Sequence, residues 1–468
     1  MLKPRTSLFS KTTWKFIRTS SRITSIARTL IIAGSALVLT VPTAQAQACP
    51  NPPPGNIVFE WTNLLLAVSG PGTSTTAARN QGNQVVSRNL AMMEAAIYDS
   101  VNAIDKGHSV YLTDARYFAY PDDSAEAAAA QAAHDVAAGL YNRPAEIALF
   151  DSTLARHLCP IPDGPARNHG IVLGQYVATQ MLLWRAGDGS TAVVPYSTGT
   201  HPGDWQPTPP NFAPTPATPQ WGHVKPFALT SGSQFRPGPP PALTSADYTE
   251  AFQEVQALGG NGTTTPSTRT PEQTEIALFW AGVGVTNAAV AIWNQIAETV
   301  AAQHNLTLIE NARLFALMNV TIADSYIAGF DAKYTFNDGH GFWRPVTAIR
   351  AANTDGNEDT VNDPTWTPLI VTVNHPSYVS LHAAQSQGAG EALAAFFGTD
   401  HVPFTATWAG VERSFQKFSA AAHEAAMSRI YAGIHWSFDG ALGRQMGRKI
   451  GSYVADNFFL PASSEKRH

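Results

Sequence analysis

Apolar residues recur every three or four positions along most of this chain, and this spacing restricts its fold more than any other feature. In the segment Arg88–Ile104, for example, Leu90, Met93, Ile97 and Val101 fall on one side of a helix. β-Branched residues in alternation are scarce, so strands have little support. The pattern predicts an all-α fold, with further helices at Ala125–Tyr141, Ala166–Arg185, Thr274–Val300, Asn311–Phe330, His382–Phe397 and Phe415–Tyr431, and a last helix running to about Phe458.

The first 46 residues have the composition of an export signal. They hold seven Lys or Arg and no acidic residue, then an apolar stretch from Leu30 to Val41 and the small-x-small pattern Ala44-Gln45-Ala46. The apolar stretch is too short to span a bilayer comfortably, which favours a cleaved signal over a membrane anchor. We therefore expect a secreted or periplasmic protein that has no membrane segment once residues 1–46 are removed.

Prolines interrupt the helical pattern between residues 187 and 245. Four aromatic residues in this stretch, Trp205, Trp221, Phe227 and Phe235, favour an ordered surface excursion over a flexible linker. We therefore divide the chain into a signal peptide (1–46), an N-terminal helical region (47–186), this Pro-rich excursion (187–245) and a C-terminal helical region (246–468).

Charge and cysteine content limit the partners and the compartment. Removing the seven positive charges of residues 1–46 takes the formal net charge from −5 to −12, and an acidic protein of this kind argues against a nucleic-acid partner. The two cysteines, Cys49 and Cys159, could pair in an oxidising compartment or could remain unpaired. The sequence leaves both arrangements open.

Six of the fourteen histidines lie between His340 and His435, together with three segments that carry candidate chemistry. The last segment, Ser428–Asp439, is predicted to be helical, so Asp439 lies one turn after His435 and can accept its Nδ1 proton. Nε2 would then be free as a nucleophile or metal ligand. Arg429 is offset from that face of a straight helix, and a helix start or kink near Gly433 could bring it to the same pocket. An ordinary capped histidine and a surface arginine are the alternative.

The other two segments supply groups that suit an oxyanion. Ser380 is predicted at a helix start, where hydroxyl and N–H groups attract anions, and His382 in the first turn can act as an acid or base. Lys333 provides a point charge and Arg344 a planar fork. Taken singly, each group is equally well explained as a helix cap, a half-buried histidine or a surface charge.

Together the segments resemble the three-part signature of the vanadium haloperoxidases and the related type 2 phosphatidic-acid phosphatases. The third part of the signature is Ser-Arg followed by five residues, a His, three further residues and an Asp. All four motif residues are present here, as Ser428, Arg429, His435 and Asp439. The stretches 221–245 and 313–350 are similar to the bacterial secreted branch of the haloperoxidases. The resemblance implies a helical-bundle fold and a vanadate cofactor, held by Lys333, Arg344, Ser380, the backbone N–H of Leu381 and Arg429, with His435 bonded to vanadium, Asp439 orienting it and His382 as the acid–base residue.

The activity that the resemblance implies is the oxidation of halide by hydrogen peroxide to hypohalous acid, which halogenates a small organic acceptor. His375 lies where bromide- and iodide-oxidising relatives tend to carry histidine, so bromide or iodide is expected over chloride; a turn-capping role for His375 is the alternative. Two other functions remain open: a secreted acid phosphatase with His435 as nucleophile, and a non-catalytic oxyanion-binding protein. A homo-oligomer is compatible with the sequence.

Three features depart from the family pattern. Leu381 replaces a glycine, which keeps the backbone N–H but loses the freedom of glycine at positive φ. Val379 replaces a proline. Ten residues separate Lys333 from Arg344, including a polar insert at 337–341, so either Lys333 folds back onto the site or His340 of the insert enters it.

Overall fold

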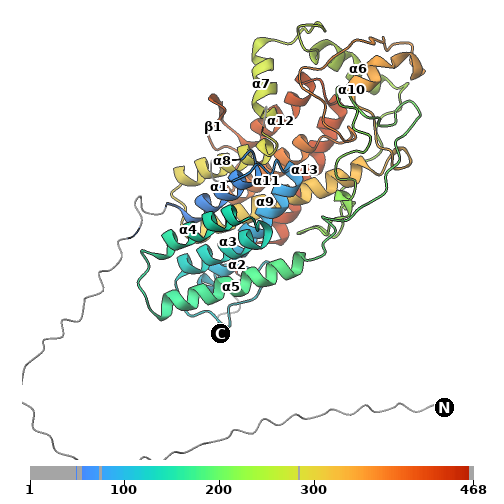
Figure 1. Ribbon diagram of the computed structural model, residues 1–468. Coiled ribbons are helices and arrows are strands. Elements are labelled where there is room, and N and C mark those ends of the chain that lie inside the picture. The colour runs from blue at the N-terminus through green and yellow to red at the C-terminus, as the bar shows by residue number, and fades with distance from the viewer. Residues whose placement is uncertain (1–48, 50–54, 73–75, 283–284, 463–468) are drawn as a thin grey trace, which may run out of the picture. The chain divides into compact units, whose positions relative to one another are not determined.

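The computed structural model describes residue 49 and residues 55–72, 76–282 and 285–462. Helices make up nearly all of its regular structure, and this confirms the predicted all-α class (Figure 1). The predicted signal peptide lies outside the described residues. The helices are α1 (Ile57–Ser69), α2 (Asn83–Asp105), α3 (Ala125–Leu140), α4 (Pro144–Leu158), α5 (Pro165–Arg185), α6 (Ala246–Leu258), α7 (Pro271–Ala281), α8 (Ala288–Gln303), α9 (Leu308–Lys333), α10 (Pro345–Arg350), α11 (Leu381–Phe397), α12 (Phe418–Tyr431) and α13 (Ser437–Asn457), and the two strands are β1 (Phe404–Trp408) and β2 (Val411–Phe415).

Hydroxyl side chains define where five of these helices begin. Each accepts a hydrogen bond from the backbone N–H three residues later, which satisfies one of the donors that a helix start leaves unpaired. In α7 and α9 a Gln or Glu at the third position returns a bond to the capping residue and completes a capping box. The five capping residues are Ser124, Ser245, Thr270, Thr307 and Ser380.

Helix α9 is the central element of the described fold. It packs against α2 from the N-terminal part of the chain and against α11 and α13 from the C-terminal part. One hydrophobic core extends over all of these helices, from Ile57 to Phe459. Asp324, fully buried in α9, accepts three backbone N–H groups from residues 227–229. The Pro-rich segment is thereby tied to the helix that ends at the candidate site.

The segment 187–245 contains one short 3₁₀ turn, Trp221–His223, and otherwise runs as an irregular ribbon, drawn green in Figure 1. Trp205 and Trp221 are buried in the core. The N–H of Trp205 donates to the carbonyl of Gly341, and the N–H of Trp343 donates to the carbonyl of Gly203. These bonds hold the Pro-rich segment against the residues that precede Arg344.

Two parts of the C-terminal region differ from the predicted helices. The stretch Thr274–Val300 is not one helix, because α7 ends at Ala281, is capped by Gly282 with a φ of 54°, and is followed by α8 only from Ala288. Phe404–Phe415 forms an antiparallel hairpin that the sequence pattern does not predict. Its strands have only five residues each, too few to establish an alternating pattern, and its turn uses Ala409 and Gly410 at positive φ.

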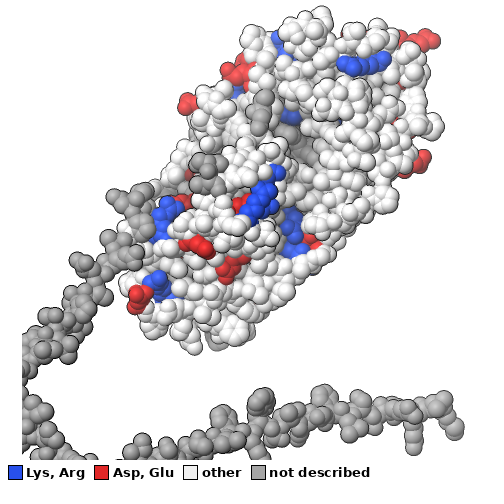
Figure 2. All heavy atoms as spheres, in the orientation of Figure 1, with Lys and Arg blue, Asp and Glu red and all other residues white. Residues whose placement is uncertain are grey.

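Cys49 and Cys159 form a disulfide, so the paired arrangement is the one that the structure adopts. The bond joins the segment before α1 to the end of α4. No helix in the described part of the chain is both long and apolar enough to cross a membrane. On the face drawn in Figure 2, basic and acidic side chains are interspersed and form no extended basic tract.

Candidate functional site

Five helix ends supply all but one of the side chains selected from the sequence, and the loop before α11 supplies His375. The five ends are the end of α9, the starts of α10, α11 and α13, and the end of α12. Pro345 occupies the first position of α10, where its fixed φ and missing N–H are well tolerated, and Arg344 is the capping residue before it. The helix ends bring together a group of buried or half-buried residues: Lys333, Arg344, His375, Ser380, Leu381, His382, Arg429, His435 and Asp439.

His435 lies in a turn between two helices and not on a continuous helix. Helix α12 ends at Tyr431, and α13 begins at Ser437. Gly433 has a φ of 76°, and a Cβ at this position would overlap the carbonyl oxygen of Gly259, so only glycine fits. The prediction of a continuous helix over Ser428–Asp439 is therefore wrong, and the interruption near Gly433 that the sequence allowed is present. The break at Gly433 is what brings Arg429 and His435 to the same pocket.

Asp439 and Arg344 fix the tautomer of His435 from opposite sides of the ring. Oδ2 of Asp439 lies 2.7 Å from Nδ1, and Nη1 of Arg344 lies 3.0 Å from Nε2. A guanidinium can only donate, so Nε2 is the accepting nitrogen and Nδ1 carries the proton. Burial and the charge of Arg344 hold the pKa of His435 well below its ordinary value. The imidazole is thus neutral, and its Nε2 lone pair points toward the cations.

Ser377 also contributes to the orientation of His435. Its Oγ donates to Oδ2 of Asp439 at 2.5 Å and lies 3.4 Å from Nδ1 of His435. The backbone N–H of Trp436 donates to the same carboxylate oxygen. Burial raises the pKa of Asp439 to about 6, although the Ser377 hydrogen bond lowers it. Nothing in the sequence pattern selects Ser377, because it lies in an irregular loop without periodicity.

Lys333 and Arg344 are fully buried and hold the surrounding backbone in place. Nζ of Lys333 donates to the carbonyls of Pro376 and Ser377 at 2.6 and 2.8 Å, which leaves its third N–H for another acceptor. Arg344 donates through Nε to the carbonyl of His375 and through Nη1 to that of Ile434. Lys333 thus folds back onto the site, as one of the two predicted arrangements requires.

Arg429 differs from the other two cations because much of its hydrogen-bonding capacity is unused. It is 3% exposed, yet Nε and Nη1 have no partner among the described residues. Burial lowers the pKa of Arg429 to about 10 and that of Arg344 to about 9, and it holds the pKa of Lys333 well below its usual value. The carboxylate of Asp439 raises the pKa of both Lys333 and Arg344. The pocket therefore carries an excess of buried positive charge.

The start of α11 adds neutral donors to this pocket. Ser380 caps the helix and is fully buried, and its own N–H donates to the carbonyl of Asp439 at 3.1 Å. Leu381 is the first helical residue and does not have a positive φ, so its backbone does not require glycine. Its side chain lies against Gly329 of α9, where a Cβ would overlap Cδ2 of Leu381. Gly329 thus provides the space that a leucine at position 381 needs.

Two further histidines border the cations. His382, half-buried in the first turn of α11, has a pKa well below its ordinary value because of burial and the charge of Arg429. Nδ1 of His375 lies 3.0 Å from Nη2 of Arg344 and 3.2 Å from the carbonyl oxygen of Pro376. The ring of Phe330 meets His375 edge-on at 5.5 Å. Both histidines are neutral and can exchange hydrogen bonds with a bound ligand.

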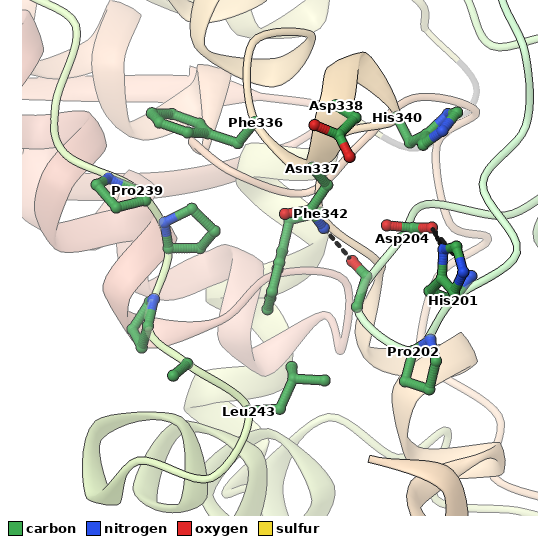
Figure 3. A pocket seen from close by; sticks show the side chains of 14 residues that line it. His201, Pro202, Asp204, Pro239, Leu243, Phe336, Asn337, Asp338, His340 and Phe342 are labelled. Carbon is green, nitrogen blue, oxygen red and sulfur yellow. Dashed lines mark hydrogen bonds and ion pairs between the residues drawn. The ribbon is translucent and has the colours of Figure 1, made fainter. Parts of the chain in front are cut away.

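His340 lies in a different hollow, of about 420 Å³, between the polar insert and the Pro-rich segment (Figure 3). Asn337 donates to the carbonyl of Gly203 across this hollow, and His201 pairs with Asp204 on its other side. Nδ1 of His340 contacts the carbonyl oxygen of Ser197. None of the cations of the site lines this hollow, so the predicted alternative in which His340 enters the site is wrong.

The arrangement as a whole favours a tetrahedral oxyanion. Cations, a capping hydroxyl and a helix N-terminus surround the unprotonated Nε2 of His435. The described residues contain no group of three or more His, Cys, Asp or Glu that could hold a metal cation directly.

Comparison with known proteins relates the chain to vanadium-dependent peroxidases. The model of the VCPO second helical-bundle domain matches residues 313–460, which include all nine of the site residues selected from the sequence. The vanadium chloroperoxidase of Curvularia inaequalis is 26% identical over 319 residues, or 53% of this chain. That match spans 51% of the chloroperoxidase, about half of its length.

Solved structures extend the likeness beyond the C-terminal part. The crystal structure of a bacterial vanadium-dependent iodoperoxidase superposes with a TM-score of 0.71 and 25% identity, covering 87% of this chain and 96% of that one. The apo form of a bacterial vanadium-dependent chloroperoxidase has the same fold, with a TM-score of 0.62 and 15% identity over 80% of this chain and 94% of that one.

Proposed function

Since this chain belongs to the vanadium haloperoxidase family, we propose that it binds vanadate in the site around His435 and oxidises halide with hydrogen peroxide. Hypohalous acid is the expected product, and it halogenates a small organic acceptor. The site residues support this proposal through their charge, their hydrogen bonds and the tautomer of His435.

One observation carries the proposal: the buried positive charge of the site, from Lys333, Arg344 and Arg429, exceeds the negative charge that Asp439 supplies. Lys333, Arg344 and Arg429 are each at most 3% exposed, and Asp439 is already engaged by Ser377 and His435. Burying a charge without a partner is costly, and an unpaired buried donor adds to that cost. A bound oxyanion removes both penalties at once. The two free nitrogens of Arg429 are therefore best explained as donors kept for an anionic ligand.

The residues present fit vanadate. His435 would hold the vanadium through Nε2, with Asp439 and Ser377 maintaining the tautomer that this bond needs. Arg344, Arg429 and the remaining N–H of Lys333 would neutralise the oxygens, together with the Ser380 hydroxyl and the N–H of Leu381. When bound, vanadate supplies a Lewis-acidic centre that activates hydrogen peroxide toward attack by halide.

His382 is the residue suited to receive a proton from hydrogen peroxide. It stands beside the cations, one residue after the helix N-terminus, and its lowered pKa keeps the imidazole neutral and able to accept. Three cations lower this pKa: Arg429 has the largest effect, followed by Arg344 and Lys333. The same three groups would bind the oxyanion. Replacement of His382 by Ala should therefore reduce turnover more than vanadate affinity.

We further propose that bromide and iodide are oxidised in preference to chloride. His375 places a polar imidazole next to Arg344, and bromide and iodide give up electrons more readily than chloride. The likeness to an iodoperoxidase structure supports the same preference. Turnover of the three halides by purified protein tests it, and equal rates with chloride and bromide would refute it.

The proposed activity is tested with protein stripped of vanadate and then reconstituted. Bromination of a phenol dye should require both vanadate and peroxide, and His435→Ala should abolish it. Hydrolysis of p-nitrophenyl phosphate that vanadate inhibits, without bromination, would instead identify a phosphatase using Nε2 of His435 as nucleophile. The absence of activity in both assays would refute catalysis and would indicate an oxyanion-binding protein.

Export remains part of the proposal. The disulfide between Cys49 and Cys159 supports it, because such bonds persist in oxidising compartments. Detection of the protein in the medium or periplasm, with an N-terminus near Gln47, is the corresponding measurement.

A further inference from the structure

Tyr326 has a buried hydroxyl that has no role in the proposed function described above. It lies on α9, 2% exposed, and its hydroxyl has no hydrogen-bond partner among the described residues. Such hydroxyls usually find a partner in the core, and each exception calls for an explanation.

The position of Tyr326 on α9 directs it toward the oxyanion site. Tyr326, Gly329, Phe330 and Lys333 follow the spacing i, i+3, i+4, i+7, so they form one stripe of the helix surface. The other three members all contact the site. Gly329 lies against Leu381, Phe330 meets His375 edge-on, and Lys333 bonds to the loop at Ser377. Tyr326 is the member of this stripe that lies two turns before Lys333.

Arg429 is the charged group that influences the pKa of Tyr326. Each acts on the other: Arg429 lowers the pKa of Tyr326 against the raising effect of burial, and Tyr326 is the one group that raises the pKa of Arg429. Yet no hydrogen bond joins them, and Nε and Nη1 of Arg429 are also without partners in the described chain. Tyr326 on α9 and Arg429 on α12 therefore each have unused hydrogen-bond donors, and the two groups interact electrostatically.

We propose that the Tyr326 hydroxyl is a binding residue for the oxyanion, donating a hydrogen bond to an oxygen on the side held by Arg429. An oxyanion oxygen has several lone pairs and can accept from both groups at once. Because burial raises the pKa of Tyr326, the phenol remains a neutral donor. This inference rests on the proposed function only in requiring that the pocket bind a tetrahedral oxyanion.

Tyr326→Phe tests this inference, because it removes the hydroxyl and keeps the ring. We expect affinities of the apo protein for vanadate and for inorganic phosphate to fall roughly tenfold by calorimetry, the loss typical of one hydrogen bond to a charged group. Apo Tyr326→Phe should unfold at the same temperature as the wild type or a higher one, since a buried unpaired hydroxyl is gone. The rise in melting temperature caused by vanadate should be smaller than in the wild type.

Tyr248→Phe is the matched control. Tyr248 is also fully buried, but its hydroxyl meets the indole of Trp343, and its pKa responds to Asp355 and Trp343 and not to Arg429. Its substitution should leave both affinities unchanged. Wild-type affinity in Tyr326→Phe would refute the role of Tyr326 alone, whereas failure of the wild-type protein to bind either anion would refute the oxyanion site itself.

Discussion

The hydroxyl of Ser377 shows how one atom can determine the state of a whole site. It shares Oδ2 of Asp439 with Nδ1 of His435, and that shared oxygen keeps the proton on Nδ1, so that Nε2, which faces Nη1 of Arg344, is the unprotonated nitrogen. Ser377→Ala should weaken vanadate binding to the apo protein roughly tenfold, the usual cost of losing a group that orients a metal-ligating histidine. The dissociation constant is measured by calorimetry or by vanadate-dependent protection against unfolding.

Ser428→Ala is the control for Ser377→Ala. Ser428 is equally buried and adjacent to Arg429, but its hydroxyl donates to the carbonyl of Ala425 within its own helix. Unchanged affinity in Ser428→Ala with a loss in Ser377→Ala assigns the effect to the contact with Asp439. Equal affinities in the two variants would contradict the role of Ser377.

At the scale of single residues, the sequence identifies the groups that belong to a motif and misses those that do not. Arg429, His435 and Asp439 could be selected because their spacing is complete, and the structure places them together. Ser377 and Tyr326 could not, because their importance depends on which atoms face them across the fold. A serine in a loop and a tyrosine in a helix carry no such signal in sequence.

Among the elements, α9 and α11 are fitted to each other at a single glycine. A methyl group at Gly329 would overlap Cδ2 of Leu381, the residue that stands where the family pattern has glycine. Gly329→Ala should therefore destabilise the protein by about 1–3 kcal/mol through overpacking. In a Leu381→Ala background the overlap is absent, and the same change should stabilise by up to about 1 kcal/mol, because Ala favours a helix over Gly.

Urea unfolding of the two single variants and the double variant measures this coupling between α9 and α11. The informative outcome is that Gly329→Ala lowers the free energy of unfolding in the wild-type background and raises it in the Leu381→Ala background. If Gly329→Ala has the same effect in both backgrounds, the contact between Gly329 and Leu381 does not limit the packing of these helices.

The ends of the helices show where sequence periodicity no longer suffices to predict the structure. The helical pattern located most of α2, α3, α5, α9 and α11 within a few residues, because each buries a regular stripe. It failed at residues 432–436, where apolar side chains continue the helical spacing through a turn. Gly433 is the sign of that turn, but its close approach to Gly259 is a tertiary contact. The geometry of the candidate site depends on this break, so the site could be predicted only in outline.

On the scale of the whole molecule, buried acids make stability depend on pH. Glu94 of α2 is fully buried; Oε1 lies 2.7 Å from the Thr62 hydroxyl, and Oε2 has no partner in the described chain. Burial, reinforced by the charge of Glu298, raises the pKa of Glu94 to about 8. Thr62 also donates to the carbonyl of Val58, so a protonated Glu94 completes this chain of hydrogen bonds by donating to Thr62.

The raised pKa of Glu94 determines whether the free energy of unfolding rises or falls with pH. The folded protein binds this proton more tightly than the unfolded chain, so its stabilising effect is complete below about pH 4.5 and is lost as the pH rises through about 8. Each unit of pKa difference is worth about 1.4 kcal/mol, so the free energy of unfolding should fall by a few kcal/mol between pH 5 and 9.

Glu94→Gln removes this dependence, because the amide cannot ionise and still donates to Thr62. The unfolding free energy of Glu94→Gln, measured in urea at pH 5, 7 and 9, should fall less with pH than that of the wild type. Glu358→Gln, an exposed loop position, should follow the wild-type curve and serves as the control. Parallel curves for Glu94→Gln and the wild type would mean that Glu94 keeps its charge in the folded protein, and the neutral chain from Glu94 through Thr62 to Val58 would then be excluded.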